Sequence, residues 1–185
     1  NIPKHKVDLL VMGFDDSKVN FEQHLHIRSK IRKSLNINKS DFVIITGGKI
    51  DRRKNIHNLM KAVSEINNNN IKLIVFGTPN EEMKSVIEKL SDNKKIINVG
   101  WVDSEKVYDY FFASDLAFFP GTHSVLWEQA VGIGLPCVFK KWEGMQHVDV
   151  GGNCCFITES TVKEIKETLI KISEDKNLFL RMKQN

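Results

Sequence analysis

The chain has 185 residues, of which 41% are hydrophobic and 27% are charged, a composition typical of one globular domain. The net charge of +4 is spread along the chain without a basic block, which argues against a nucleic-acid partner. No apolar run is long enough for a transmembrane helix, and the apolar core of the N-terminal segment is too short for a signal peptide. We therefore expect a cytoplasmic protein with no transmembrane segment.

The cysteines and histidines give no pattern typical of a metal site. Cys137, Cys154 and Cys155 form no CxxC pair and no disulfide framework, so reduced thiols in a cytosolic compartment are the simplest interpretation. His24 and His26 are two residues apart, which places them on different faces of a helix. The sequence therefore predicts no zinc site and no other metal site.

Apolar residues predict helices and strands that alternate along the chain. A helix is expected from about Asn20, with Phe21, Leu25 and Ile31 facing inward, and is followed by a buried strand in DFVIITGG. Later strands are expected in IKLIVFG, KIINVGWV, DLAFFP, PCVFK and CCFIT. Three helix starts are predicted from capping residues, namely the capping box Thr78-Pro79-Asn80-Glu81, Asp103 and Thr161.

Strands with continuous apolar runs, alternating with amphipathic helices, indicate a parallel sheet covered on both faces. We predict an α/β fold, a doubly wound Rossmann-like sheet of about six strands with helices on both faces. In such sheets ligands bind beyond the carboxyl ends of the strands, near the point where the strand order reverses. The loops after the strands are therefore the places to look for binding residues.

The first such loop is GGKIDRRKN, residues 47–55. Its glycines permit a tight turn, and Lys49 and Lys54 place ammonium groups near a helix N-terminus, which favours a phosphate site. A basic surface turn is the alternative. The loop contains neither a P-loop nor a GxGxxG motif, and the absence of GxGxxG argues against an NAD(P) dehydrogenase.

The second loop is NVGWVDSEKV, residues 98–107. Trp101 follows a strand and a glycine, and could offer an aromatic wall to a nucleobase. The pattern alone favours the other interpretation, in which this tryptophan packs in the core.

The third segment is GTHSVLWEQAVGIGLP, residues 121–136, in which Glu128 is the single carboxylate. On a helical wheel Glu128 points away from the apolar stripe, so a solvent-facing glutamate fits the periodicity. However, no lysine and no other acidic residue accompanies Glu128 on its face, and small residues flank it one turn away. Both interpretations of Glu128 remain open from the pattern.

Together these segments resemble the C-terminal nucleotide-binding domain of GT-B fold glycosyltransferases, in the retaining group often called family 4. GGKIDRRKN is similar to the family's glycine-plus-basic-pair loop, and WEQAVGIGLPCV is similar to its EA-x-A-x-G-x-P-V-V helix and strand. VGWVDSEKVYDYFFASDLAFFPG resembles the strand, base-binding loop, helix and strand between them. The resemblance implies one nucleotide-sugar-binding domain over residues 1–185, a fragment of a two-domain chain whose N-terminal acceptor domain is absent.

The resemblance implies a role for each loop. Lys49 and Lys54 correspond to the basic pair that grips the donor diphosphate, and Glu128 corresponds to the second glutamate of the E-x7-E motif, which hydrogen-bonds the ribose hydroxyls. The donor is expected to be a UDP- or GDP-sugar, and the lysines and helix end allow transfer without a metal. The expected nucleotide-sugar-binding residues are Gly48, Lys49, Lys54, Trp101, Val102, His123, Ser124, Val125 and Glu128.

Three positions depart from the family pattern. Pro120 stands where the first motif glutamate is expected, His123 replaces a usual glycine or aromatic neighbourhood, and His147 stands about where many members have another glutamate. In the family these positions lie near the donor sugar. His123 is therefore the candidate for a sugar or phosphate contact, or for a catalytic residue, with a water-exposed loop histidine as the alternative.

We therefore expect a retaining, hexosyltransferase-type enzyme that transfers a sugar to a glycan or lipid-linked acceptor, with the isolated domain inactive. The acceptor would be held by the missing N-terminal domain, and the full-length protein could associate with the inner face of the membrane. Two alternatives are a GT-B sugar-nucleotide epimerase, which Pro120 disfavours, and a non-catalytic nucleotide-binding or scaffold module, which Pro120 favours.

Overall fold

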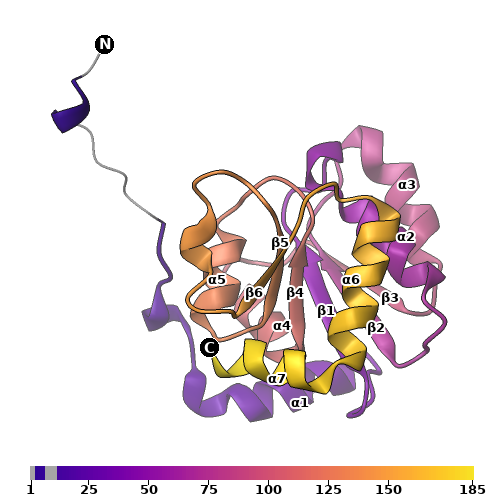
Figure 1. Cartoon of the computed structure of the whole chain (residues 1–185). Coiled ribbons are helices and arrows are strands. Elements are labelled where there is room, and N and C mark those ends of the chain that lie inside the picture. Colours follow the sequence, from indigo (N-terminus) through magenta and orange to yellow (C-terminus); the bar gives the residue numbers. More distant parts are fainter. Residues whose placement is uncertain (1–2, 7–11) are drawn as a thin grey trace.

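A computed structural model describes residues 3–6 and 12–185, and residues 24–184 form one parallel sheet with helices on both of its faces (Figure 1). The sheet has six strands in the order β3-β2-β1-β4-β5-β6, so the predicted doubly wound fold is confirmed. The strands are β1 (Phe42–Gly47), β2 (Ile71–Phe76), β3 (Ile96–Gly100), β4 (Leu116–Phe119), β5 (Cys137–Lys140) and β6 (Cys154–Ile157). The order reverses between β1 and β4, which pair directly.

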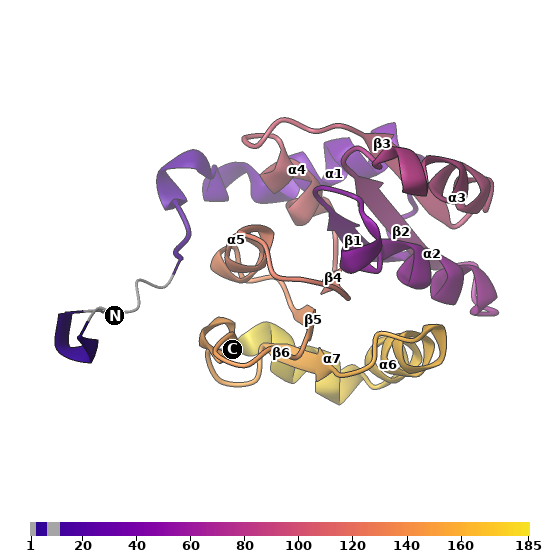
Figure 2. The ribbon, with the colours of Figure 1, turned by 90° about the horizontal axis from the view of Figure 1, so that it is seen from above.

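Helices cover both faces of the sheet (Figure 2). One face carries α1 (His24–Ser34), α4 (Val107–Ala113) and α5 (Leu126–Gly132). The other carries α2 (Ile56–Glu65), α3 (Glu81–Ser91) and α6 (Val162–Glu174), with α7 (Lys176–Gln184) packed against α6. An apolar core lies between the sheet and each of the two helix layers. There are two cores because alternate side chains of every strand point to opposite faces of the sheet. Among the helices of the described residues, none has the length and apolarity needed to cross a membrane.

The first long helix does not bury the residues that its sequence pattern indicated. Phe21 and Leu25 are 42% and 69% exposed, and the buried residue of α1 is Arg32. The predicted inward orientation of Phe21 and Leu25 is therefore wrong. The residue that α1 buries is an arginine with polar partners, and a search for apolar periodicity does not detect such a residue.

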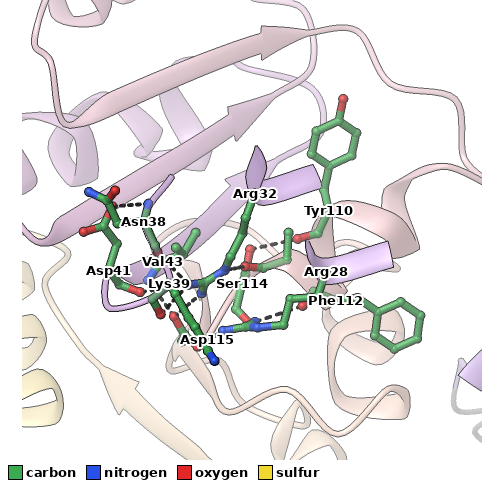
Figure 3. A network of polar contacts seen from close by, with 11 residues as sticks. Arg28, Arg32, Asn38, Lys39, Asp41, Val43, Tyr110, Phe112, Ser114 and Asp115 are labelled. Atoms are coloured by element: carbon green, nitrogen blue, oxygen red, sulfur yellow. Dashed lines mark hydrogen bonds and ion pairs between the residues drawn. The ribbon is translucent and has the colours of Figure 1, made fainter. Parts of the chain in front are cut away.

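These contacts converge on Asp115, the residue before β4 (Figure 3). Arg32 Nη2 donates to Asp115 Oδ2 at 2.7 Å, and Arg28 Nη2 donates to Asp115 Oδ1 at 2.5 Å. The backbone N–H of Val43 donates to Asp115 Oδ2, and Arg32 Nε donates to the carbonyl of Ala113. Burial lowers the pKa of Arg32, and the charge of Asp115 opposes this shift. Asp115 thus joins α1 to the starts of β1 and β4.

The three predicted helix caps have different outcomes. Thr161 caps α6, since its side chain accepts a hydrogen bond from the backbone of Glu164. The prediction for α3 is wrong in register, because Asn80 is the capping residue and Thr78 lies outside the helix. Asp103 does not cap α4, which begins only at Val107.

Candidate functional site

The loops that follow β1 and β4 lie side by side at the point where the strand order reverses. A side chain on Gly121 would place its Cβ 2.4 Å from the carbonyl oxygen of Arg53 and the Cα of Lys54, so the two loops approach too closely for any residue but glycine. The N–H of Thr122 donates to the same Arg53 carbonyl, and the amide of Asn55 donates to the carbonyl of Pro120. The fold therefore fixes these two candidate loops against each other.

Lys54 strengthens this junction. It ends a single 3-10 turn, η4 (Arg52–Lys54), and its Nζ donates to the carbonyls of Thr122 at 2.8 Å and His123 at 2.9 Å. Burial lowers the pKa of the ammonium group, and the charge of Asp51 opposes this shift. An ammonium has three N–H donors, so Lys54 keeps one for a ligand after these two bonds.

Lys49 lies in the same loop and is exposed, with no side-chain hydrogen bond or ion pair to any described residue. It follows Gly48, whose φ of +101° turns the chain after β1. A Cβ on Gly48 would lie 3.0 Å from Leu126 Cδ1, so the glycine also allows the loop to pass close to the start of α5. This turn places Lys49, a cation without a partner among residues 3–6 and 12–185, at the carboxyl end of β1.

A pocket of about 650 Å³ opens beside this turn. Trp101 and Val102, which follow β3, form part of its wall, and Gly48, Ser124 and Val125 lie on the side of the β1 and β4 loops. Trp101 is 74% exposed, so the interpretation that it packs in the core is wrong. The structure instead leaves its indole ring free at an open pocket, where a planar ligand could stack.

Glu128 is only 6% exposed, so its interpretation as a solvent-facing side chain is also wrong. Its Oε1 lies 2.7 Å from Nε2 of His123 and 2.9 Å from Nε2 of His147. Its Oε2 is buried and has no hydrogen-bond partner among the described residues. The polar face of α5 is thus covered by other parts of the chain.

The segment after β5 provides this cover. His147 lies in the 3-10 turn η5 (Gln146–Val148), which contacts α5, and Trp142 donates from Nε1 to the carbonyl of Gly121 at 3.2 Å. On the inner side, Trp127 stacks on Phe139 of β5, with ring centroids 4.3 Å apart. Sequence reasoning noted His147 only as a departure from a family pattern and did not include it in the site.

His123 completes this group of polar side chains. Its ring meets Trp127 edge-on, with centroids 5.1 Å apart, and its Nε2 contacts Glu128. The interpretation of His123 as a water-exposed loop residue does not describe it, because the side chain is only 24% exposed and is paired. Pro120 is buried at the end of β4 and puts no carboxylate there.

The reversed strand order and the pocket at the carboxyl ends of the strands are features of Rossmann-like α/β domains, which bind their ligands at this place. The particular family is given by sequence comparison. The profile of the family described as Glycosyl transferases group 1 matches residues 27–185, and the chain belongs to this family. The predicted family is therefore confirmed.

Solved structures agree with this assignment at the level of the fold. WaaG, a glycosyltransferase involved in lipopolysaccharide biosynthesis, matches 98% of this chain and 51% of its own, with a TM-score of 0.79 and 20% identity. Anabaena Alr3699/HepE, solved in complex with UDP and glucose, matches 94% of this chain and 49% of its own, with a TM-score of 0.75 and 19% identity.

A curated relative gives a similar result. The uncharacterized glycosyltransferase MJ1607 of Methanocaldococcus jannaschii is 19% identical over 154 residues, which is 80% of this chain and 40% of the relative. The chain thus spans about half the length of WaaG and HepE, and less than half of MJ1607.

Proposed function

We propose that this chain is the donor-binding domain of a glycosyltransferase and that its pocket holds a UDP- or GDP-sugar. The observation that carries the proposal is the pocket at the strand-order reversal, which is lined by the exposed Trp101 ring and by Gly48, the residue before the exposed Lys49. A flat aromatic surface suits a nucleobase, and ammonium groups suit a diphosphate. The UDP bound to HepE, which shares this fold, supports the assignment.

In this proposal each part of the donor has its own residues. The base stacks on Trp101 beside Val102, and the diphosphate is held by Lys49 and the remaining N–H of Lys54. The backbone at Gly48, Ser124 and Val125 lines the path between them. His123 lies toward the donor sugar. The positive charge of the lysines stabilises the leaving diphosphate, so we propose that transfer needs no metal.

Glu128 can serve as the ribose ligand only after a rearrangement. Its Oε1 already accepts from His123 and His147, and its Oε2 is buried. We propose that at least one imidazole moves away when the nucleotide enters, which frees a carboxylate oxygen for the ribose hydroxyls.

The complete reaction requires more than this domain. We propose a hexosyltransferase-type reaction with retention, an acceptor that is a glycan or lipid-linked, and a second, N-terminal domain that binds this acceptor. The corresponding location is the cytoplasm, with peripheral association at the inner face of the membrane. The isolated chain should bind nucleotide and show little or no transfer.

Calorimetric titration with UDP, GDP and ADP tests the proposal and identifies the base. Replacement of Trp101 by alanine should weaken binding of the preferred nucleotide by about tenfold, because base–aromatic stacking contributes about 1–3 kcal/mol. Trp101→Phe is the matched control and should keep most of the affinity. Absence of nucleotide binding at millimolar concentration would refute the proposed function.

The ribose contact has a separate test. Glu128→Ala should abolish the preference of the wild-type protein for a ribonucleotide over the matching 2′,3′-dideoxynucleotide, while the affinity for the dideoxynucleotide stays unchanged. Thermal denaturation should first establish that the variant is folded. A variant that still prefers the ribonucleotide would exclude Glu128 as the ribose ligand.

A further inference from the structure

The group formed by His123, Glu128 and His147 brings together side chains from three parts of the chain. His123 lies in the loop after β4, Glu128 on α5, and His147 in η5 after β5. Each residue offers one ligand atom, and these atoms all lie within 4.8 Å of one another. We propose that this group binds a divalent transition metal ion, and that Zn²⁺ is the ion that matches it best.

The burial of Glu128 provides the first argument. Its side chain is 5% exposed, and its polar contacts among the described residues are with the two imidazoles of His123 and His147. By comparison, the side chain of Asp115 is 18% exposed and is paired with two guanidinium groups, which carry a permanent charge. A buried carboxylate is costly without a compensating cation. A divalent ion would supply that charge at Glu128.

The types of ligand provide the second argument. Imidazole nitrogen and carboxylate oxygen are both ligands that Zn²⁺ prefers, and three protein ligands leave a fourth position for water. The free electron pairs of the Nε2 atoms are available to a metal when the proton resides on Nδ1. The separations of 2.7 and 2.9 Å between Oε1 and the Nε2 atoms are those of hydrogen bonds, so the side chains must move apart slightly to admit the ion.

An ion also has an entry path and a free acceptor. The side chains of His123 and His147 are 24% and 23% exposed, so the group is open to solvent on the histidine side. Oε2 of Glu128, which has no hydrogen-bond partner among the described residues, could join Oε1 in binding the ion. This proposal does not depend on the proposed function. If Glu128 is also the ribose ligand, Zn²⁺ and nucleotide should oppose each other's binding.

Titration of the full chain with ZnCl₂, without nucleotide, tests the site directly. We expect one ion per chain, and Co²⁺ should give visible absorption bands typical of a low-coordinate nitrogen–oxygen site. His123→Ala, His147→Ala and Glu128→Gln should each lower the Zn²⁺ affinity at least about tenfold, because even loss of a residue that only orients a ligand costs 10–100-fold. Each variant should also lose the rise in melting temperature that Zn²⁺ gives the wild-type protein.

Two controls separate this site from other zinc ligands. His26→Ala removes an exposed histidine on α1, and Cys154→Ser with Cys155→Ser removes the two thiols of β6; both proteins should bind Zn²⁺ like the wild type. The proposal is overturned if Zn²⁺ does not bind, or if the three site variants bind it as tightly as the wild type. Since these titrations contain no nucleotide, their failure would leave the donor-binding proposal unaffected.

Discussion

Replacement of Asp115 by alanine is expected to lower the free energy of unfolding by about 3 kcal/mol, the lower end of the range for removing one partner of a buried ion pair, because these pairs are partly buried. The carboxylate accepts hydrogen bonds from Arg28, Arg32 and the backbone of Val43. Its loss leaves the Arg32 guanidinium, whose side chain is 7% exposed, without a counter-charge. Urea denaturation of the two proteins, followed by circular dichroism, measures the difference.

The matched control is Asp103→Ala. Asp103 also carries an ion pair, with Lys106, but its side chain is 68% exposed, so its loss should change stability by no more than about 0.5 kcal/mol. A similarly small effect at Asp115 would mean that water enters and replaces the network, and that α1 is held by its apolar contacts alone.

Replacement of both Lys49 and Lys54 by alanine is expected to weaken binding of the nucleoside diphosphate by about 100-fold, or about 2.8 kcal/mol. Hydrogen bonds to charged groups contribute about 1.5–3 kcal/mol each. The affinity for the nucleoside, which lacks the diphosphate, should stay nearly unchanged. Calorimetry with UDP and uridine, or with the corresponding pair for the preferred base, measures both values.

The two lysines should also differ when replaced singly. Lys54 is bonded to the carbonyls of Thr122 and His123, so Lys54→Ala should lower the melting temperature as well as the affinity. Lys49 has no such bonds to described residues, so Lys49→Ala should lower the affinity alone. Arg52→Ala removes an exposed cation of the same loop that pairs with Glu82, and serves as the charge control. An equal loss of affinity in this control would indicate only a general attraction of anions.

The fold could be predicted from the sequence because its strands are buried on both faces. Runs such as that of Phe42–Gly47 are apolar throughout, and this pattern is typical of central parallel strands. The helix ahead of β1 was predicted from the same kind of signal, with the wrong face. Its contact with the sheet is made by Arg32 and Arg28 through Asp115, more than 80 positions later in the chain, and no local pattern contains that pairing.

The candidate site, like the fold, could be predicted from the sequence only in part. Sequence reasoning identified Lys49, Lys54 and Glu128 as unusual residues in loops and helices after strands, and the fold brings the loops of these residues to one edge of the sheet. The sequence pattern could not predict how far Trp101 and Glu128 are exposed to solvent. A helical wheel describes only one helix, whereas the burial of Glu128 depends on a segment after β5.

The sequence by itself determined the order of the strands along the chain, the family and the residue types available to a ligand. The tertiary structure decided which of these side chains meet. His123 and His147 lie on either side of β5 in the sequence, and only the pairing of β4 with β5 brings both to Glu128. Hydrophobic periodicity is a local property of the chain, whereas the neighbours of a buried polar group come from distant segments, so only the folded chain reveals them.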